Sequence, residues 1–281
     1  MRLNKKKKSF IKGFFINLAL IIGAVIILFP VFWMLSTSLK KSGMELAFPP
    51  QFIPKTFEFK NYAEVWSSLP FGTFITNSLI IALLSTIGQV FTGALAGYAF
   101  ARINFRGKNI WFWICISTML LPEVVLLVPQ FIIFTKLKWI DTFLPLIVPS
   151  WLGGRAFYIF LARQYFLSIP QEIIDASKID GASNFRIFFN IMLPLAKPVL
   201  AAMAVVRFVT DWNDFLAPLL YLSSIENKTL SVGMYLFLTR YGGNWNLLMA
   251  ASTIMIVPTL IFFLIAQKYY LKGIVMTGLK V

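Results

Sequence analysis

Long apolar stretches alternate with short polar segments along this chain. Three of the stretches contain no charged residue at all: 13–39, 65–101 and 241–267. Each exceeds the about 20 apolar residues that an α-helix needs to cross a bilayer. With three further apolar stretches that hold a few charges, the pattern predicts six spanning helices. We expect them at about 13–35, 74–101, 109–135, 143–167 and 198–222, and between Arg240 and Lys268.

Composition supports a protein that is solvated by lipid. The 281 residues are 58% hydrophobic and 13% charged, and a soluble domain carries about twice that share of charge. We therefore expect an all-α, polytopic membrane protein with one transmembrane domain over 1–281 and a core at about 71–271. Residues 1–12 form a basic N-terminal segment, 36–70 an external loop and 168–197 a cytoplasmic loop between helices 4 and 5. Pro49, Pro50 and Pro54 argue against a regular helix in the external loop.

The net charge of +15 reflects topology rather than a nucleic-acid partner. With the N-terminus inside, 16 of the 26 Lys and Arg residues fall in inside segments and 8 in outside segments. The excess of basic residues marks the cytoplasmic side. We expect a multi-pass protein of the cell membrane with both termini in the cytoplasm. The first segment also has features of a signal peptide, but its apolar stretch is long and Ser36–Ser38 makes a poor cleavage site.

The residue inventory excludes several kinds of chemistry. The chain has no histidine, which removes His-based acid–base catalysis, and its single cysteine, Cys115, forms no internal disulfide. We find no G-x-x-x-x-G-K-[ST] phosphate loop. An enzyme embedded in the membrane would need a convergent set of reactive groups, which the scattered acids do not supply. We expect no catalytic residue, no metal and no cofactor bound by this chain.

The segment from Ser168 to Pro194 holds the most specific pattern. Pro170 suits the first turn of a helix, and Glu172 and Asp175 place negative charge near its N-terminus. Ile173, Ala176 and either Ile179 or Asp180 recur at helical spacing, and Gly181 can end the helix in a left-handed conformation.

A second short helix is expected over about 183–190, with Phe185, Phe188 and Phe189 on it, before Pro194 turns the chain back to the membrane. So much helix and apolar surface in a cytoplasmic loop favours a docking site. An interfacial helix that lies on lipid headgroups is the alternative.

The same segment resembles the E-A-A…G…I-x-L-P motif of the inner-membrane subunits of binding-protein-dependent ABC importers. The matching residues are Asp175-Ala176-Ser177, Gly181 after three residues, then Ile191 and Leu193-Pro194 after nine more. The spacing is kept, while Asp175 replaces Glu and Ser177 replaces the second Ala. The motif covers 20 residues with fixed gaps and is therefore specific.

This resemblance implies a role for the loop. In that family it is a coupling helix that seats in a cytoplasmic ATPase subunit, so that ATP-driven closure of the ATPase dimer switches the permease between inward-open and outward-open states. The implied partners are a related permease subunit, the ATPase dimer, which holds ATP and magnesium, and an extracytoplasmic solute-binding protein. The residues to which the resemblance assigns the coupling role are Glu172, Asp175, Ala176, Ser177, Gly181, Ile191, Leu193 and Pro194.

Other stretches are similar to the carbohydrate branch of this family, namely 160–170, 211–218 and the ending with Lys272-Gly273. These stretches are similar to the second permease of maltose-type and multiple-sugar systems. The similarity implies a sugar or short oligosaccharide as the solute. A permease for peptides or amino acids shares the coupling motif and remains an alternative. A secondary transporter is a further alternative, but nothing in that class predicts the 163–197 loop.

Charged residues inside the predicted spans mark candidate functional positions, because charge in a bilayer is costly unless it faces a partner or a pathway. Arg207 and Asp211 are four residues apart and can form an intramembrane ion pair, with a purely structural role as the alternative. Glu123, which follows Pro122, is expected to contact Arg155 beside Gly153 and Gly154.

Trp212, Asn213, Asp214 and Glu123 are candidates for the translocation path. Sugars need hydroxyl-bonding groups and a flat aromatic surface, and Trp212 could supply the aromatic surface. Packing of Trp212 against the partner subunit is the alternative. Gly88, Gly93 and Gly97 in the second span predict a close contact with a neighbouring helix.

Overall fold

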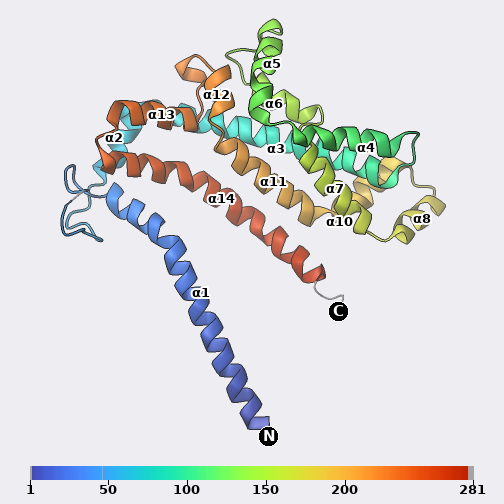
Figure 1. The fold of residues 1–281 in the computed structure, drawn as a ribbon, viewed down its shortest axis with the longest axis horizontal. Helices are drawn as coiled ribbons and strands as arrows, with labels where there is room; N and C mark the ends of the chain where they lie inside the picture. Colours follow the sequence, from blue (N-terminus) through green and yellow to red (C-terminus); the bar gives the residue numbers. More distant parts are fainter. Residues whose placement is uncertain (1, 46, 278–281) are drawn as a thin grey trace. The chain divides into compact units, whose positions relative to one another are not determined.

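The computed structural model describes residues 2–45 and 47–277, and these residues contain helices and no strand (Figure 1). The predicted all-α class is confirmed. Four helical stretches are long and apolar enough to cross a membrane: Lys12–Ser38, Phe71–Arg102, Leu144–Ser168 and Trp245–Ile265. Two bent helix pairs, Lys108–Leu120 with Glu123–Lys136 and Asn184–Leu195 with Lys197–Trp212, raise the number to six if each pair is one span.

The chain forms two compact units. One takes in the N-terminal part of the chain up to Leu69 together with Leu236–Ile256, and the other begins at Pro70, runs to Tyr235 and resumes at Val257. In the first unit, helix α1 spans Arg2–Ser38. Its side chains between Lys12 and Phe29 are exposed or half-buried, although its mean hydropathy reaches 2.8. Lipid is the solvent that suits such a surface.

The external loop contains a helix that the sequence analysis excluded. Helix α2 spans Lys60–Ser68. The expectation was wrong because the three prolines end at Pro54, so all backbone N–H groups of α2 are available. Asn61 fixes α2 to the end of α1, since its side-chain amide donates to the carbonyls of Ser38 at 2.8 Å and Lys40 at 2.9 Å.

Helix α3, Phe71–Arg102, is the central element of the second unit, and α6, α7 and α11 pack along it (Figure 1). The predicted close contact at its glycines is confirmed. A Cβ added at Gly97 would lie 2.7 Å from the Ala162 Cβ on α7, and one at Gly88 would lie 2.6 Å from the Trp151 side chain. Small residues let the helix backbones approach, as they do in other membrane helix pairs.

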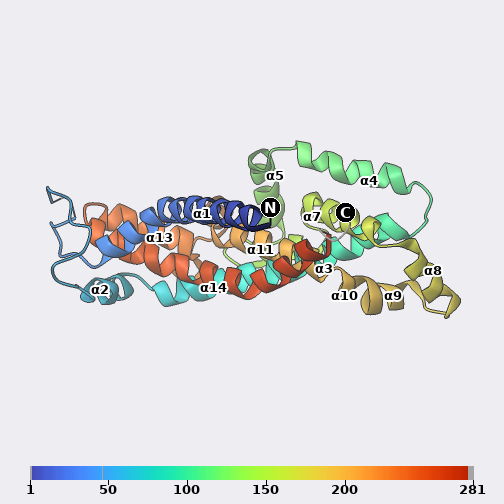
Figure 2. The same cartoon turned by 90° about the horizontal axis from the view of Figure 1, so that it is seen from below.

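Three of the predicted spans are broken rather than continuous. The expected helix 109–135 consists of α4 (Lys108–Ser117), a short 3₁₀ turn η1 (Thr118–Leu120) and α5 (Glu123–Lys136), with a bend of 101° between the two parts (Figure 2). Pro122 lies at the break, where its missing N–H and its ring prevent a continuous helix. Pro129 lies inside α5 without ending it.

The expected helices 143–167 and 198–222 are also interrupted. Helices α6 (Leu144–Trp151) and α7 (Ala156–Ser168) are separated by 152–155, where Gly153 and Gly154 have φ of 104° and 53°. Helix α11 (Lys197–Trp212) ends before α12 (Leu216–Tyr221). The remaining elements are α8 (Gln171–Ile179), α9 (Asn184–Ile187), the π-helical turn η2 (Phe188–Met192), α10 (Leu193–Leu195), η3 (Ile225–Asn227), α13 (Leu230–Tyr241) and α14 (Trp245–Thr277).

Candidate functional site

Helix α8 forms where the sequence predicts an amphipathic helix. Pro170 precedes its first turn, Glu172 lies in that turn, and Gly181 follows its end with φ of 77°. This left-handed turn lets the N–H of Ala182 donate to the Ser177 carbonyl at 2.9 Å. The prediction that Gly181 ends the helix in a left-handed conformation is confirmed.

The two faces of α8 have different surroundings. Ile174 is 1% exposed and belongs to the same core cluster as Tyr98 and Phe166. On the other face, Ile173 and Ala176 are exposed and Ile179 is 86% exposed. The apolar residues noted at helical spacing therefore point away from their own unit. An apolar face exposed at a helix between two spans is a surface for contact with another molecule.

The second half of this loop differs from the expected helix over 183–190. Helix α9 covers only Asn184–Ile187, with Ser183 as its N-cap, and the chain then widens into the π-helical turn. Phe188 and Met192 are buried in the core cluster, whereas Phe185 is 70% exposed. Ile191 and Leu193 are half-buried and Pro194 is exposed. Phe188 and Met192 therefore attach this turn to the core, while Phe185 faces away from it.

The structure brings charged residues together at the three helix breaks. Glu123 begins α5, Arg155 immediately precedes α7, and Asp214 lies between α11 and α12. The Arg155 guanidinium lies 2.9 Å from the Glu123 carboxylate, with side chains 39% and 67% exposed. In many secondary transporters, broken helices place solute-binding groups near the middle of the membrane, and the three breaks here place charged groups in a comparable way.

A second pair lies deeper in the same unit. Arg207 and Asp211 are 2.8 Å apart, with side chains 7% and 9% exposed, and Arg207 also donates to the Ser150 hydroxyl at 3.0 Å. Asp214 interacts electrostatically with Arg155, Arg207 and Glu123. We call these five residues the charge cluster: Glu123, Arg155, Arg207, Asp211 and Asp214. It contains three carboxylates and two guanidinium groups.

A polar stripe on α3 holds the break between α6 and α7. The Gln89 side-chain oxygen accepts the backbone N–H of Arg155 at 2.8 Å, and the Thr92 hydroxyl donates to the Ser150 carbonyl at 2.9 Å. Ser85 likewise donates to the Leu146 carbonyl at 3.0 Å. Lipid offers no hydrogen bonds to backbone groups exposed by a break, so these side chains replace water. The sequence analysis missed them, although Ser85, Gln89 and Thr92 recur at helical spacing in an uncharged span.

The other path candidates lie in different environments. Trp212 is 1% exposed and its ring stacks on Phe208 at 5.9 Å, so it offers no open aromatic face in this structure. Asn213 is exposed, and its amide donates to the Val209 carbonyl of its own helix at 2.8 Å. The Asp214 carboxylate accepts the N–H of Ala217 in the first turn of α12 at 3.4 Å.

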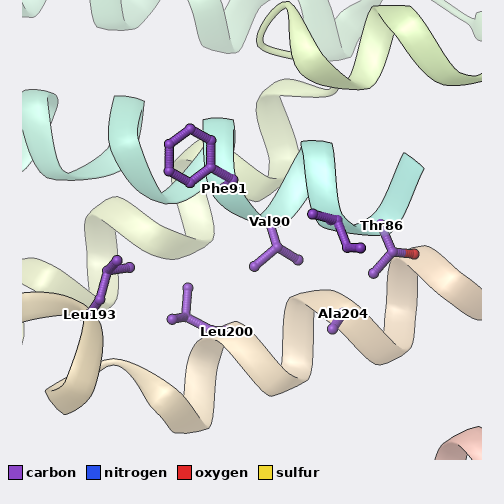
Figure 3. Close-up of a pocket in the computed structure, with 7 residues that line it drawn as sticks. Thr86, Val90, Phe91, Leu193, Leu200 and Ala204 are labelled. Carbon is purple, nitrogen blue, oxygen red and sulfur yellow. The ribbon is translucent and has the colours of Figure 1, made fainter. Parts of the chain in front are cut away.

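A groove of about 340 Å³ lies between α3 and α11 and ends near α10 (Figure 3). Val90, Phe91, Leu193 and Leu200 line it, and its one hydroxyl-bearing residue, Thr86, has its oxygen buried. A sugar needs hydrogen-bonding partners for its hydroxyls. The groove therefore does not suit a sugar, and the charge cluster is the more suitable polar site in this unit.

The described residues contain no group of three or more His, Cys, Asp or Glu side chains that could hold a metal ion.

Comparison with known proteins identifies the family of this chain. The sequence profile of the binding-protein-dependent transport system inner membrane component matches residues 89–275. The chain belongs to this family of ABC importer permeases.

Two relatives match almost the whole chain. The chain is 33% identical to the arabinooligosaccharides transport system permease protein AraQ of Halalkalibacterium halodurans, over 98% of this chain and 99% of the relative. It is 30% identical to the sn-glycerol-3-phosphate transport system permease protein UgpE of Yersinia pestis, over 93% of this chain and 95% of the relative.

Solved structures share the fold. A chain of a bacterial ABC transporter that imports the acidic polysaccharide alginate superposes with a TM-score of 0.77 at 24% identity, over 92% of this chain and 96% of that one. A chain of the MetNI methionine ABC transporter in inward-facing form superposes with a TM-score of 0.51 at 19% identity, over 70% of this chain and 93% of that one.

Proposed function

We propose that this permease moves a neutral sugar or short oligosaccharide into the cell, and that a separate ATPase drives it through helix α8. The observation that carries the ATPase coupling is the face of α8. Three apolar residues are exposed together on this helix: Ile173, Ala176 and Ile179. Ile174 anchors the same helix to the core cluster of the second unit. A helix that is fixed on one side and apolar on the other is suited to transmit movement between two proteins.

The proposed topology has six spans: the four long helical stretches, the bent pair of α4 with α5, and a span at about 198–222 that begins with α11. Both termini and the 168–197 loop lie in the cytoplasm, in agreement with the excess of basic residues in those segments. α8 is then on the side of the membrane where ATP is available. ATP and magnesium belong to the ATPase dimer, and a related permease subunit and an extracytoplasmic solute-binding protein complete the assembly.

The charge cluster supports a neutral solute. Its two guanidinium groups are offset by three carboxylates, and Arg155 and Arg207 each lie within 3 Å of one of them. An anion such as glycerol phosphate is favoured by positive charge that no carboxylate offsets. The 33% identity to an arabinooligosaccharide permease supports the sugar class. Glu123, Arg155 and Asp214 at the helix breaks are the proposed path residues, with exposed Asn213 beside them and Trp212 as packing support.

The coupling claim is tested with Gly181→Asp and its matched control Gly181→Asn. Asp and Asn both tolerate a positive φ and have nearly the same shape, so the pair differs mainly in charge. The complex of this chain with its ATPase, second permease and binding protein is reconstituted in liposomes. We expect Gly181→Asp to lose solute-stimulated ATP hydrolysis while the complex still assembles, and Gly181→Asn to retain most of it.

Unchanged hydrolysis and uptake in Gly181→Asp would remove the coupling role of the loop. Uptake that follows an ion gradient without ATP would instead place the protein among secondary transporters. The solute class is decided separately, by uptake of a labelled arabinooligosaccharide against labelled glycerol 3-phosphate and a dipeptide. Preference for either of the latter two would overturn the neutral-sugar assignment and leave the coupling result intact.

A further inference from the structure

Arg102, the last residue of α3, joins three separate segments at one end of the second unit. Its guanidinium donates to the Phe166 carbonyl at 3.1 Å from Nε and 2.7 Å from Nη2, and also to the Ile169 carbonyl. Its third nitrogen, Nη1, donates to the side-chain oxygen of Gln171 at 2.5 Å. These bonds cross from α3 to the end of α7 and to the first residue of α8.

The carbonyls that Arg102 reaches lie at the C-terminal end of α7, where the Phe166 carbonyl also accepts the N–H of the C-cap residue Ile169 at 3.3 Å. The last four carbonyls of a helix have no partner within the helix, and a positive charge is favourable at that end. Phe166 is also fixed by packing, because its buried ring meets Tyr98 of α3 edge-on at 6.0 Å. Tyr98 lies one turn before Arg102. The ends of α3 and α7 are thus held by both apolar and charged contacts.

A continuous chain of hydrogen bonds leads from Arg102 into the motif helix. Gln171 uses its oxygen for Arg102 and its nitrogen for the Asp175 carboxylate, at 2.9 Å. Asp175 is the acidic residue of the coupling motif and also attracts Arg102 electrostatically. The planar guanidinium has five N–H donors in a fixed arrangement, so one side chain can serve α7 and α8 at once.

The other contacts of α3 extend this connection to the charge cluster. Gln89 lies 13 residues before Arg102 on α3, about 20 Å along the helix axis, and it holds the backbone N–H of Arg155. No proline interrupts α3. One unbroken helix therefore contacts the start of α8 at one end and the break beside the Glu123–Arg155 pair further along.

We propose that Arg102 is a positioning residue that ties α8 to α3, so that movement of α8 by the ATPase is transmitted along α3 to the break between α6 and α7. This inference rests on the proposed function. In this proposed role, Arg102 contacts neither the solute nor the nucleotide. Its role is to keep the two helices together while α8 is displaced, for which the fixed planar fork of a guanidinium is better suited than the compact ammonium of a lysine.

The test measures solute taken up per ATP hydrolysed, in reconstituted complexes with equal subunit content. Arg102→Lys keeps the charge but lacks the planar fork, and Gln171→Leu removes the next link on the exposed side of α8. The matched control is Arg106→Gln, which removes an exposed arginine from the turn after α3. We expect Arg102→Lys and Gln171→Leu each to lower the uptake per ATP by roughly tenfold, the size of a typical coupling between sites. The control Arg106→Gln should keep the wild-type ratio.

Equal uptake per ATP in wild type, Arg102→Lys and Gln171→Leu would overturn the proposal that Arg102 ties α8 to α3. If Arg102→Lys fails to assemble, Gln171→Leu alone decides, because its side chain is exposed at the start of α8 and the core cluster does not include it. Gly181→Asp separates this failure from failure of the proposed function. If Gly181→Asp loses stimulated hydrolysis while Arg102→Lys and Gln171→Leu behave like wild type, α8 remains the coupling helix. Only the proposed role of Arg102 is then removed.

Discussion

The side-chain oxygen of Gln89 accepts the backbone N–H of Arg155 at 2.8 Å, at a point where α6 has ended and α7 has not begun. Gln89 is fully buried, and a Cβ at Gly154 would lie 1.8 Å from its oxygen. A side chain of one helix thereby takes the place of a missing helical carbonyl in another. The geometry of the Glu123–Arg155 pair depends on this bond, because it orients the backbone from which Arg155 extends.

Gln89→Leu should destabilise the complex. The substitution leaves the partly buried Arg155 N–H without a partner, which costs up to about 1–3 kcal/mol. Thermal unfolding of the detergent-solubilised complex measures the effect. Thr76→Val is the control, because Thr76 is exposed on the same helix and donates only to the Gly72 carbonyl one turn away. Equal melting temperatures for Gln89→Leu and Thr76→Val would show that the bond does not hold the break.

The Glu123–Arg155 pair should respond to a charge swap. Glu123→Arg and Arg155→Glu each place like charges side by side, and we expect both to reduce solute uptake. The double variant restores opposite charges and should recover activity, with a coupling energy of about 0.5–1 kcal/mol for a half-exposed pair. A double variant no better than the worse single variant would show that the contact has no functional weight.

The Arg207–Asp211 pair should behave as a buried ion pair. Arg207→Met leaves the Asp211 carboxylate buried without its cation, at a cost of about 3–5 kcal/mol. The double variant Arg207→Met with Asp211→Leu removes both charges and should recover most of that loss. Thermal unfolding tests the recovery of stability. If the double variant is stable but transports no solute, the pair serves the path, whereas normal transport assigns it to the structure alone.

Asp141 gives the loop after α5 a pH-dependent attachment. Hydrogen bonds from the hydroxyl and N–H of Ser224, the N–H of Ser223 and the side chain of Asn227 hold the pKa of the Asp141 carboxyl well below its usual range. A lowered pKa in the folded state stabilises the protein above the unfolded pKa of about 4 and loses this contribution as the pH falls further.

Asp141→Asn is the matched variant, because Asn also tolerates the positive φ of 63° at this position. We expect it to lower the melting temperature at pH 7 and to approach wild type as the pH falls from about 4 to 3. Ser224→Ala, which removes one donor, should show a smaller form of the same trend. A difference between Asp141→Asn and wild type that is constant from pH 7 to pH 3 would contradict the assignment.

The candidate site could be predicted only in part. Gly181 was recognisable because a glycine after an amphipathic helix has a specific conformational use, and the structure gives it φ of 77°. Arg102 gave no comparable signal. It ends an apolar span, where a basic residue is expected from topology alone, and its partners Phe166 and Ile169 are more than 60 residues away in the chain.

The breaks show the same division. The bend between α4 and α5 has a local cause, because the missing N–H of Pro122 is a property of the residue itself. The adjacent Gly153 and Gly154 permit the break at 152–155, but the contacts that hold it come from Gln89 and Thr92 of α3, which no local pattern records. Helix α2 differs from the expectation because the prolines of the external loop all precede it, and residues 60–68 contain none.

The sequence by itself determined the helical class, the membrane environment and the short helix with its glycine stop. These follow from hydrophobic length and from backbone preferences, which act within a few neighbouring residues. Only the tertiary structure decided which face of α8 is exposed, which charges meet at the helix breaks, and which side chain joins α3 to α8. Those features are contacts between residues that are distant in the chain, and their energies exist only after the helices have packed.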